Sequence, residues 1–122
     1  MTDRISDAEY AVMDVLWADA PQDASTVADR LATSQGWTLA TVKTLLSRLA
    51  AKGAVETTAD GRKFLYRPLI ERGTYVSGES QRFVDRLFGG KLSPLVAHLA
   101  EREALSADDI AEIEALIKGL KA

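Results

Sequence analysis

The side chains best suited to chemistry in this sequence are hydroxyls and cations, and they gather in two short stretches. The first stretch runs from Thr38 to Arg48, and the second is the pair Arg62-Lys63. Lysine and arginine bind phosphate groups, while small and hydroxyl side chains let a helix approach base edges in the major groove. The combination predicts a surface that binds double-stranded DNA. The candidate DNA-binding residues are Thr38, Ala40, Thr41, Lys43, Thr44, Ser47, Arg48, Arg62 and Lys63.

These candidates divide into two kinds of contact. At 100° per residue, the hydroxyl side chains lie on the helix side opposite the leucines, with cations beside them. We expect Thr44, Ser47 and Arg48 to face base edges, and Arg62 and Lys63 to contact phosphates. An ordinary solvated helix face is the alternative interpretation of the first stretch alone. The basic pair that follows it favours DNA.

Catalytic and metal-binding patterns are missing from the sequence. It contains no cysteine, which excludes disulfides, thiolate metal sites and thiol catalysis. Its one histidine, His98, falls inside a predicted helix, and no glycine-rich phosphate loop or histidine–carboxylate cluster is present. We therefore expect no enzymatic activity, no cofactor and no bound metal.

A helix followed by a β-hairpin is predicted to position the two stretches. Thr38 is the expected N-cap of the helix, and Gly53 is the expected left-handed residue that ends it. Asp60-Gly61, between two β-prone runs, is a strong hairpin signal. Apolar residues recur along the helix at i, i+3, i+4 and i+7, which predicts a buried face of Val42, Leu45, Leu46 and Leu49.

Two shorter helices are predicted before this helix. Ser6 and Glu9 form a capping box that begins the first, and Pro21 disfavours its continuation. A loop over 21–24 then leads to a second helix from Ser25, the expected N-cap, to Ala32. Its expected buried side consists of Val27, Ala28, Leu31 and Ala32. Three helices and a hairpin within residues 1–68 predict a winged helix-turn-helix domain that binds DNA.

The charge of the chain is unevenly distributed. The whole sequence carries a net charge of −3 and has a pI near 5.1, which by itself argues against nucleic acid. Residues 37–68, however, hold six cationic and two acidic side chains, whereas residues 1–36 hold two cationic and seven acidic ones. The phosphates of bound DNA interact with the charges of the surface next to them more than with the net charge of the whole chain. This uneven distribution of charge therefore supports DNA binding by residues 37–68.

Residues 69–122 are predicted to be helical, with segments over 70–88, 93–103 and 106–120. Ser93-Pro94 is read as an N-cap followed by proline, and Ser106 with Asp109 as a capping box. About fifty amphipathic residues cannot bury a substantial core alone, so we expect them to pair with a second copy in a homodimer. The candidate dimerisation residues are Val76, Phe83, Leu87, Phe88, Leu95, Leu99, Ile110, Ile113, Leu116, Ile117 and Leu120.

The sequence resembles the penicillinase repressor family, also called the BlaI/MecI/CopY family. The likeness runs from Ser6 to Leu120 and is strongest in TVKTLLSRLAAKG and GRKFLYRPLI, with FVDRLFGGKLSPLVAHLAE and LSADDIAEIEALI supporting it. The resemblance implies a mainly α-helical winged-helix repressor of transcription with a small β-hairpin. It would act as a cytoplasmic homodimer on a palindromic operator. The recognition helix would fall on 37–52, the wing on 60–63 and the dimerisation region on 70–120.

Two departures from the family pattern concern release from DNA. Antibiotic-resistance members are cleaved at an Asn-Phe bond, but the matching place here, Ala97-His98-Leu99, has none. Copper-responsive members carry cysteine pairs, which this chain lacks. Because exposed glycine-rich breaks are favoured sites of nicking, we hypothesise that a partner sensor protease cleaves between Gly89 and Leu99.

Two remaining expectations concern location and an alternative function. No apolar run approaches the ~18 residues of a membrane helix, and no signal peptide pattern is present, so no membrane partner is expected. The alternative function is that of a winged-helix adapter that binds other proteins without contacting an operator. The acidic first third of the chain keeps this alternative open.

Overall fold

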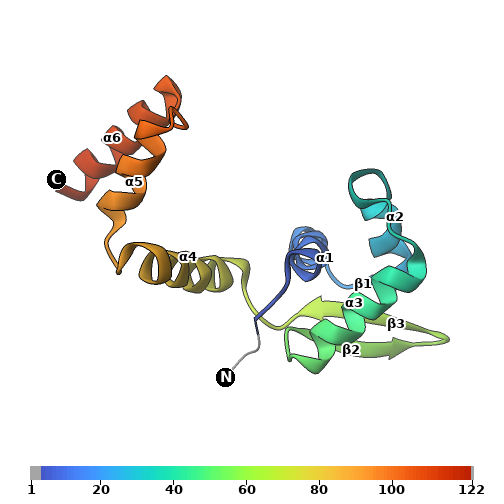
Figure 1. Ribbon diagram of the computed structural model, residues 1–122. Coiled ribbons are helices and arrows are strands. Elements are labelled where there is room, and N and C mark those ends of the chain that lie inside the picture. Colours follow the sequence, from blue (N-terminus) through green and yellow to red (C-terminus); the bar gives the residue numbers. More distant parts are fainter. Residues whose placement is uncertain (1–3, 122) are drawn as a thin grey trace. The chain divides into compact units, whose positions relative to one another are not determined.

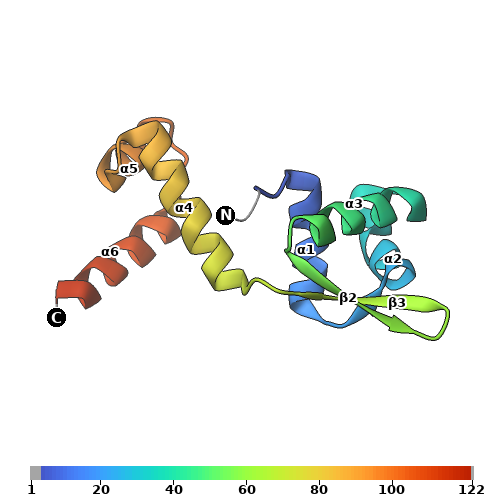
Figure 2. The same ribbon diagram turned by 90° about the horizontal axis from the view of Figure 1, so that it is seen from below.

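The structure, a computed structural model, describes residues 4–121 and divides into two compact units. The first unit extends to Tyr75 and the second begins at Val76. Both contain helices, and the first also contains a small antiparallel sheet (Figures 1 and 2). The sequence predicts a division after Pro68. In the structure, the first unit also includes residues 69–75.

Three helices form the core of the first unit: α1 (Asp7–Ala18), α2 (Ala24–Gln35) and α3 (Leu39–Ala51). The predicted leucine face of α3 is buried against the other two helices, as expected from its spacing. Ala32 is exposed, so its predicted burial is wrong. The largest fully buried side chains are Met13, Leu16, Leu46, Leu49, Glu9, Val12, Val27 and Val42.

Side-chain caps set the starts of these helices. The capping box of Ser6 and Glu9 is confirmed by both of its reciprocal hydrogen bonds, and Thr38 accepts a hydrogen bond from the Thr41 amide at 3.2 Å. The prediction of Ser25 as N-cap of α2 is wrong. The N-cap is Asp23, whose extended backbone turns its carboxylate toward the Thr26 amide at 2.8 Å.

The sheet contains one strand more than the predicted hairpin. Strands β2 (Val55–Asp60) and β3 (Lys63–Pro68) form the hairpin, called the wing below, with Asp60 opposite Lys63. The predicted loop over 21–24 instead contains β1 (Gln22–Asp23), which pairs with the other side of β3. Two residues are too few to show the alternation that predicts a strand from sequence.

The second unit consists of most of α4 (Arg72–Phe88), α5 (Leu92–Glu101) and α6 (Ala107–Lys121). The capping box of Ser106 and Asp109 is confirmed by two hydrogen bonds of 3.0 Å. The predicted N-cap Ser93 is wrong, because α5 begins earlier, with Lys91 at the N-cap. Pro94 therefore lies inside the first turn, where the amide it lacks would have no helical partner anyway.

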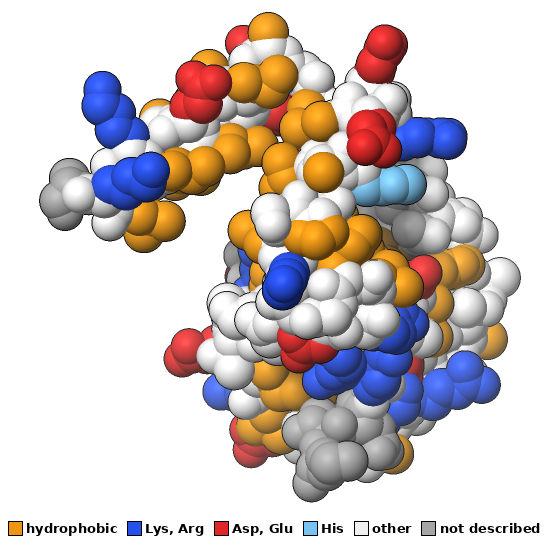
Figure 3. All heavy atoms as spheres, turned by 60° about the vertical axis from the view of Figure 1, so that its left-hand side comes forward, with side chains coloured by type: hydrophobic (Ala, Val, Ile, Leu, Met, Phe, Trp, Pro, Cys, Tyr) orange, Lys and Arg blue, Asp and Glu red, His pale blue; other side chains and the backbone are white. Residues whose placement is uncertain are grey.

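No helix of the second unit has a buried residue among those described. The exposed large hydrophobic side chains include Phe83, Leu87, Leu92, Ile110, Leu116, Ile117 and Leu120. Figure 3 shows hydrophobic side chains along one side of the helix that projects at the upper left and on the helices next to it. The apolar faces of this unit are thus left open to solvent in a single chain.

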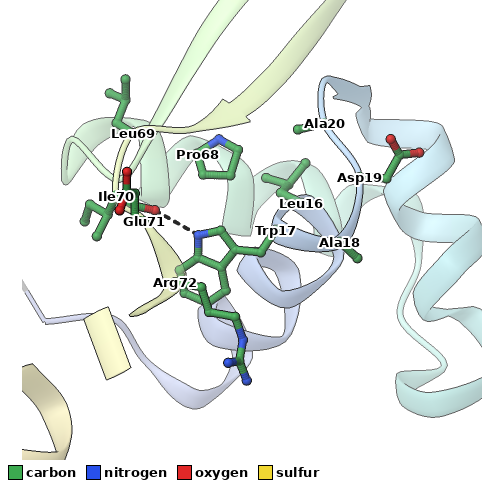
Figure 4. Close-up of a pocket in the computed structure, with 10 residues that line it drawn as sticks. All are labelled: Leu16, Trp17, Ala18, Asp19, Ala20, Pro68, Leu69, Ile70, Glu71 and Arg72. Atoms are coloured by element: carbon green, nitrogen blue, oxygen red, sulfur yellow. Dashed lines mark hydrogen bonds between the residues drawn. The ribbon is translucent and has the colours of Figure 1, made fainter. Parts of the chain in front are cut away.

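The first turn of α4 belongs to the first unit because several contacts attach it to α1. The Trp17 indole Nε1 donates a hydrogen bond to the Ile70 carbonyl at 2.8 Å, beside a shallow pocket of about 610 Å³ (Figure 4). The ring of Tyr75 lies 5.8 Å from Trp17 and 5.7 Å from Tyr10 between centroids. These contacts account for a division of the chain after Tyr75.

An ion pair inside the first unit connects the start of α1 with the end of α3. The Nζ of Lys52 lies 2.6 Å from Oε1 of Glu9, whose side chain is only 1% exposed. The same oxygen accepts a hydrogen bond from the Ser6 amide at 2.7 Å. Burial, the largest single influence, raises the pKa of Glu9, but the hydrogen bonds from Lys52 and Ser6 together hold it below its usual value.

We predict that Lys52→Met destabilises the protein by about 3 kcal/mol at neutral pH, because it leaves a buried carboxylate without its cation. Since the pKa of Glu9 is lowered on folding, its contribution is present above the unfolded pKa of about 4.3 and is lost as the pH falls through the folded pKa. The difference between wild type and variant should therefore narrow below about pH 4.

Urea unfolding across this pH range measures the difference. Lys43→Met is the matched control, because Lys43 is an exposed lysine on the same helix, and it should change stability by less than about 0.5 kcal/mol. Equal effects of the two substitutions would contradict a structural role for the ion pair.

Candidate nucleic-acid interface

The outward face of α3 carries the side chains that the sequence singled out. Val42, Leu45, Leu46 and Leu49 lie inward, and this burial directs the intervening residues to solvent. Six of the predicted DNA-binding residues are exposed together on this outward face: Ala40, Thr41, Lys43, Thr44, Ser47 and Arg48. The face combines small residues, hydroxyls and cations over the whole length of the helix.

Three hydroxyls, at the start of α3 and along its outward face, are held by local hydrogen bonds. The Thr38 hydroxyl caps the helix and lies 3.2 Å from the Thr41 hydroxyl, so both side chains have defined positions. The Thr44 hydroxyl donates to the Ala40 carbonyl at 3.1 Å. A hydroxyl that donates in this way still has lone pairs, so Thr44 can accept a hydrogen bond from a base or a solvent molecule.

The turn of the wing lies toward the end at which α3 begins, and both ribbon views show this arrangement (Figures 1 and 2). Its turn consists of Gly61 and Arg62, and Gly61 has a φ of 63°, which glycine adopts without strain. A groove of about 270 Å³ separates the wing from the helices. It is lined by Asp23, Ala24, Ser25, Leu39, Lys43, Arg62, Lys63, Phe64 and Tyr66.

The cations predicted from the sequence do not all contribute to this groove. Lys43, Arg62 and Lys63 line it, whereas Arg48, on the outward face of α3, is not part of the lining. Lys52, which the charge count for residues 37–68 includes, is bound to Glu9 and to the Arg4 carbonyl. The positive count for residues 37–68 therefore overstates the charge that is available for a ligand. The three groove cations nevertheless form a concave basic surface next to the N-terminus of α3, where the helix dipole also favours anions.

Sequence reasoning missed several residues of the groove. Asp23 ion-pairs with Lys63 at 3.4 Å between Oδ2 and Nζ, and the short strand β1 positions it. Leu39 and Phe64 are exposed large hydrophobic residues in the lining. Exposed and half-buried positions do not alternate along β3, so no pattern in the sequence indicated Phe64. Nothing in the sequence signalled the pairing of β1 with β3 either.

The described part of the chain also lacks the features of a metal site and of a membrane-spanning segment. No group of three or more histidine, cysteine or acidic residues there is arranged to hold a metal ion. None of the helices formed by residues 4–121 is long and apolar enough to cross a membrane.

Comparisons with known proteins agree with this geometry. The sequence profile of the family described as penicillinase repressor matches residues 5–119. A penicillinase repressor from Bacillus licheniformis is 33% identical over 94% of this chain and 90% of its own length. The solution structure of the DNA-binding domain of the repressor BlaI has a TM-score of 0.55 and 36% identity, and the match covers 62% of this chain and 94% of that one.

A second solved structure contains DNA. It is the solution structure of monomeric BlaI from Bacillus licheniformis in complex with the blaP half-operator, with a TM-score of 0.53 and 36% identity over 62% of this chain and 92% of that one. Fold and neighbours thus define the class of the protein as a winged-helix, DNA-binding transcriptional repressor. Within that class, the chain belongs to the penicillinase repressor family, whose members are repressors and not enzymes.

Proposed function

We propose that this protein represses transcription as a homodimer that binds a palindromic operator through α3 and the wing. The observation that carries the proposal is the groove between α3 and the wing, with its three cations next to an exposed face of hydroxyls. The solved complex of the relative BlaI with a half-operator supports it. Binding to chromosomal DNA would place the repressor in the cytoplasm.

The proposed contacts differ between helix and wing. Thr44, Ser47 and Arg48 on α3 face base edges, where a good contact is worth about 1–3 kcal/mol. Arg62 and Lys63 on the wing contact phosphates, which carry no sequence information. The remaining interface residues, Thr38, Ala40, Thr41 and Lys43, lie at the helix N-terminus, whose dipole favours a nearby phosphate.

We predict that Lys63→Ala weakens binding to all duplexes by a similar factor and lowers the salt slope by about 1, because one phosphate contact is lost. Thr44→Ala should instead change the preference among sequences. The full chain is used to select duplexes from a random pool, and the affinities of both variants are then measured on selected and unrelated DNA at several salt concentrations.

Glu56→Ala is a control for these variants, since Glu56 is an exposed wing residue at the end remote from the turn. It should leave sequence preference unchanged. A change of preference with Lys63→Ala, together with none for Thr44→Ala, would contradict the proposed placement of helix and wing.

The second unit supports the proposal of a homodimer. Its helices lack buried residues among those described, so a single chain leaves their apolar faces in water. Burial of apolar surface stabilises association by roughly 25 cal/mol per Å², which favours covering these faces with a second copy. A dimer would also hold two winged-helix units together, and binding of both to two half-sites gives an avidity that a single unit lacks. The proposed dimer residues Val76, Leu95, Leu99 and Ile113 are half-buried, as is Phe88.

We predict that Leu116→Asp dissociates the dimer without unfolding the chain. The side chain of Leu116 is 70% exposed in one chain, so the substitution disturbs little packing inside it, yet a charge in the proposed interface would be costly. Sedimentation of wild type at micromolar concentration should return twice 13.2 kDa, and that of the variant 13.2 kDa.

The matched control is Ala111→Asp, which adds the same charge on the opposite side of α6, at an exposed position. It should remain dimeric. A monomeric wild type that bound its operator tightly would overturn the proposed dimer.

Release from DNA is proposed to occur through cleavage by a partner protease between Gly89 and Leu99. Gly89 and Gly90 are exposed and have φ values of 59° and 83°, and α5 begins only at Leu92. The segment 89–91 is thus an accessible, non-helical target between two helices. A cut there would remove α5 and α6 and with them much of the proposed dimer surface.

We predict that induction of the target genes is accompanied by fragments that end within 89–99. Mass spectrometry of the repressor in induced cells detects them, with uninduced cells as the control. A cleaved chain would bind a single half-site alone, so its affinity for the operator should be lower than that of the intact dimer by about 100-fold or more. Full induction while the chain stays intact would rule out cleavage as the signal.

A protein-binding adapter is the second candidate function. The observation that favours it is the exposure of Leu39 and Phe64, of which Phe64 is 55% exposed, in the groove lining. The rest of the outward face of α3 is polar, however, and apolar side chains also contact thymine methyl groups. Failure of the full chain to enrich any duplex from the random pool would favour the adapter.

A further inference from the structure

The groove beside the wing contains one acidic side chain among its cations. Asp23 shares the lining with Lys43, Arg62 and Lys63, and its Oδ2 lies 3.4 Å from the Nζ of Lys63. Carboxylate and phosphate oxygens both bind ammonium groups through charge-assisted hydrogen bonds. In the DNA-free protein, the wing lysine therefore already has an anionic partner of the kind that DNA would supply.

Backbone contacts on both sides fix the position of Asp23. It pairs with Leu65 of β3, and it is the N-cap of α2, where Oδ1 accepts a hydrogen bond from the Thr26 amide at 2.8 Å. One carboxylate oxygen is thus bound to the helix while the other faces Lys63. The side chain of Asp23 is 19% exposed and that of Lys63 is 59% exposed. The lysine can turn toward a ligand, whereas the carboxylate is held in place.

The carboxylate of Asp23 keeps its charge at neutral pH. Hydrogen bonds from Thr26 have the largest effect on the pKa of Asp23 and lower it, and the neighbouring ammonium group of Lys63 lowers it further. The opposite charges on the two side chains therefore persist under the conditions in which DNA is bound.

We propose that Asp23 is an intramolecular competitor for the wing lysine, with its carboxylate bound to Lys63 until a DNA phosphate takes its place. This inference rests on the proposed binding of DNA by the wing. Because the lysine contacts phosphate and not a base, the competition lowers the affinity for every duplex by one common factor and leaves sequence preference unchanged. An exposed ion pair is weak, so the expected factor is about threefold.

Asp23→Asn tests the proposal, because asparagine is an equally good N-cap and keeps the hydrogen bond to Thr26 while removing the charge. Fluorescence anisotropy with the full chain should show affinity rising about threefold for the selected duplex and for unrelated DNA in parallel. The salt slope should stay nearly unchanged, because Lys63 contacts one phosphate in both complexes. Asp23→Ser, a second capping residue without charge, should give the same gains.

Two controls separate this competition from a general change in charge. Asp29→Asn removes the same charge from an exposed position on α2 outside the groove lining, and it should raise affinity by clearly less. In a Lys63→Ala background, Asp23→Asn should give no larger gain than the Asp29→Asn control. A full threefold gain in that background would overturn the proposal, as would equal gains at positions 23 and 29 in the wild-type background.

DNA binding by the wing and competition by Asp23 are tested by different outcomes. If wild type binds no duplex at all, the proposed function is contradicted, and the competition falls with it. If wild type binds DNA and Asp23→Asn changes nothing, the proposed function stands and only the competition is contradicted.

Discussion

The ion pair between Glu9 and Lys52 is the interaction on which the geometry of the first unit depends. Glu9 contacts two helices, because its Oε1 accepts the Ser6 amide hydrogen bond of the α1 capping box and also binds Nζ of Lys52 at the end of α3. The start of one helix and the end of another are thereby joined inside the core. The outward face of α3, its N-cap and the wing that follows it all take their positions from this joined pair of helices.

The two units of the chain use apolar residues in opposite ways. In the first unit, the leucines of α3 are buried in a core shared with α1 and α2, and the polar face remains for a ligand. In the second, the helices are amphipathic and leave Leu116, Leu120 and their neighbours exposed. The first is a domain that folds around its own core, and the second supplies surface that needs a partner to cover it. This contrast is the physical basis for proposing that the first unit binds DNA and the second unit forms the dimer.

Periodicity and capping made much of the fold predictable from sequence. The leucine spacing of α3, the caps Ser6, Thr38 and Ser106 and the wing were all identified correctly, because each depends on residues close in sequence. The strand β1 and the role of Asp23 were not, since they depend on pairing with a strand some forty residues away. Lys52 was included in the positive charge count for residues 37–68 for the same reason, because its partner Glu9 lies 43 residues away in the sequence.

We infer that the outward face of α3 and the turn of the wing together form the surface that binds DNA. Titrating the isotopically labelled full chain with a duplex selected from random DNA, while following its amide resonances by NMR, tests this claim most directly. We expect the largest shift changes to cluster within residues 38–48 and 61–64. Changes confined to α1 and α2 or to the second unit, with residues 38–48 unaffected, would contradict this inference.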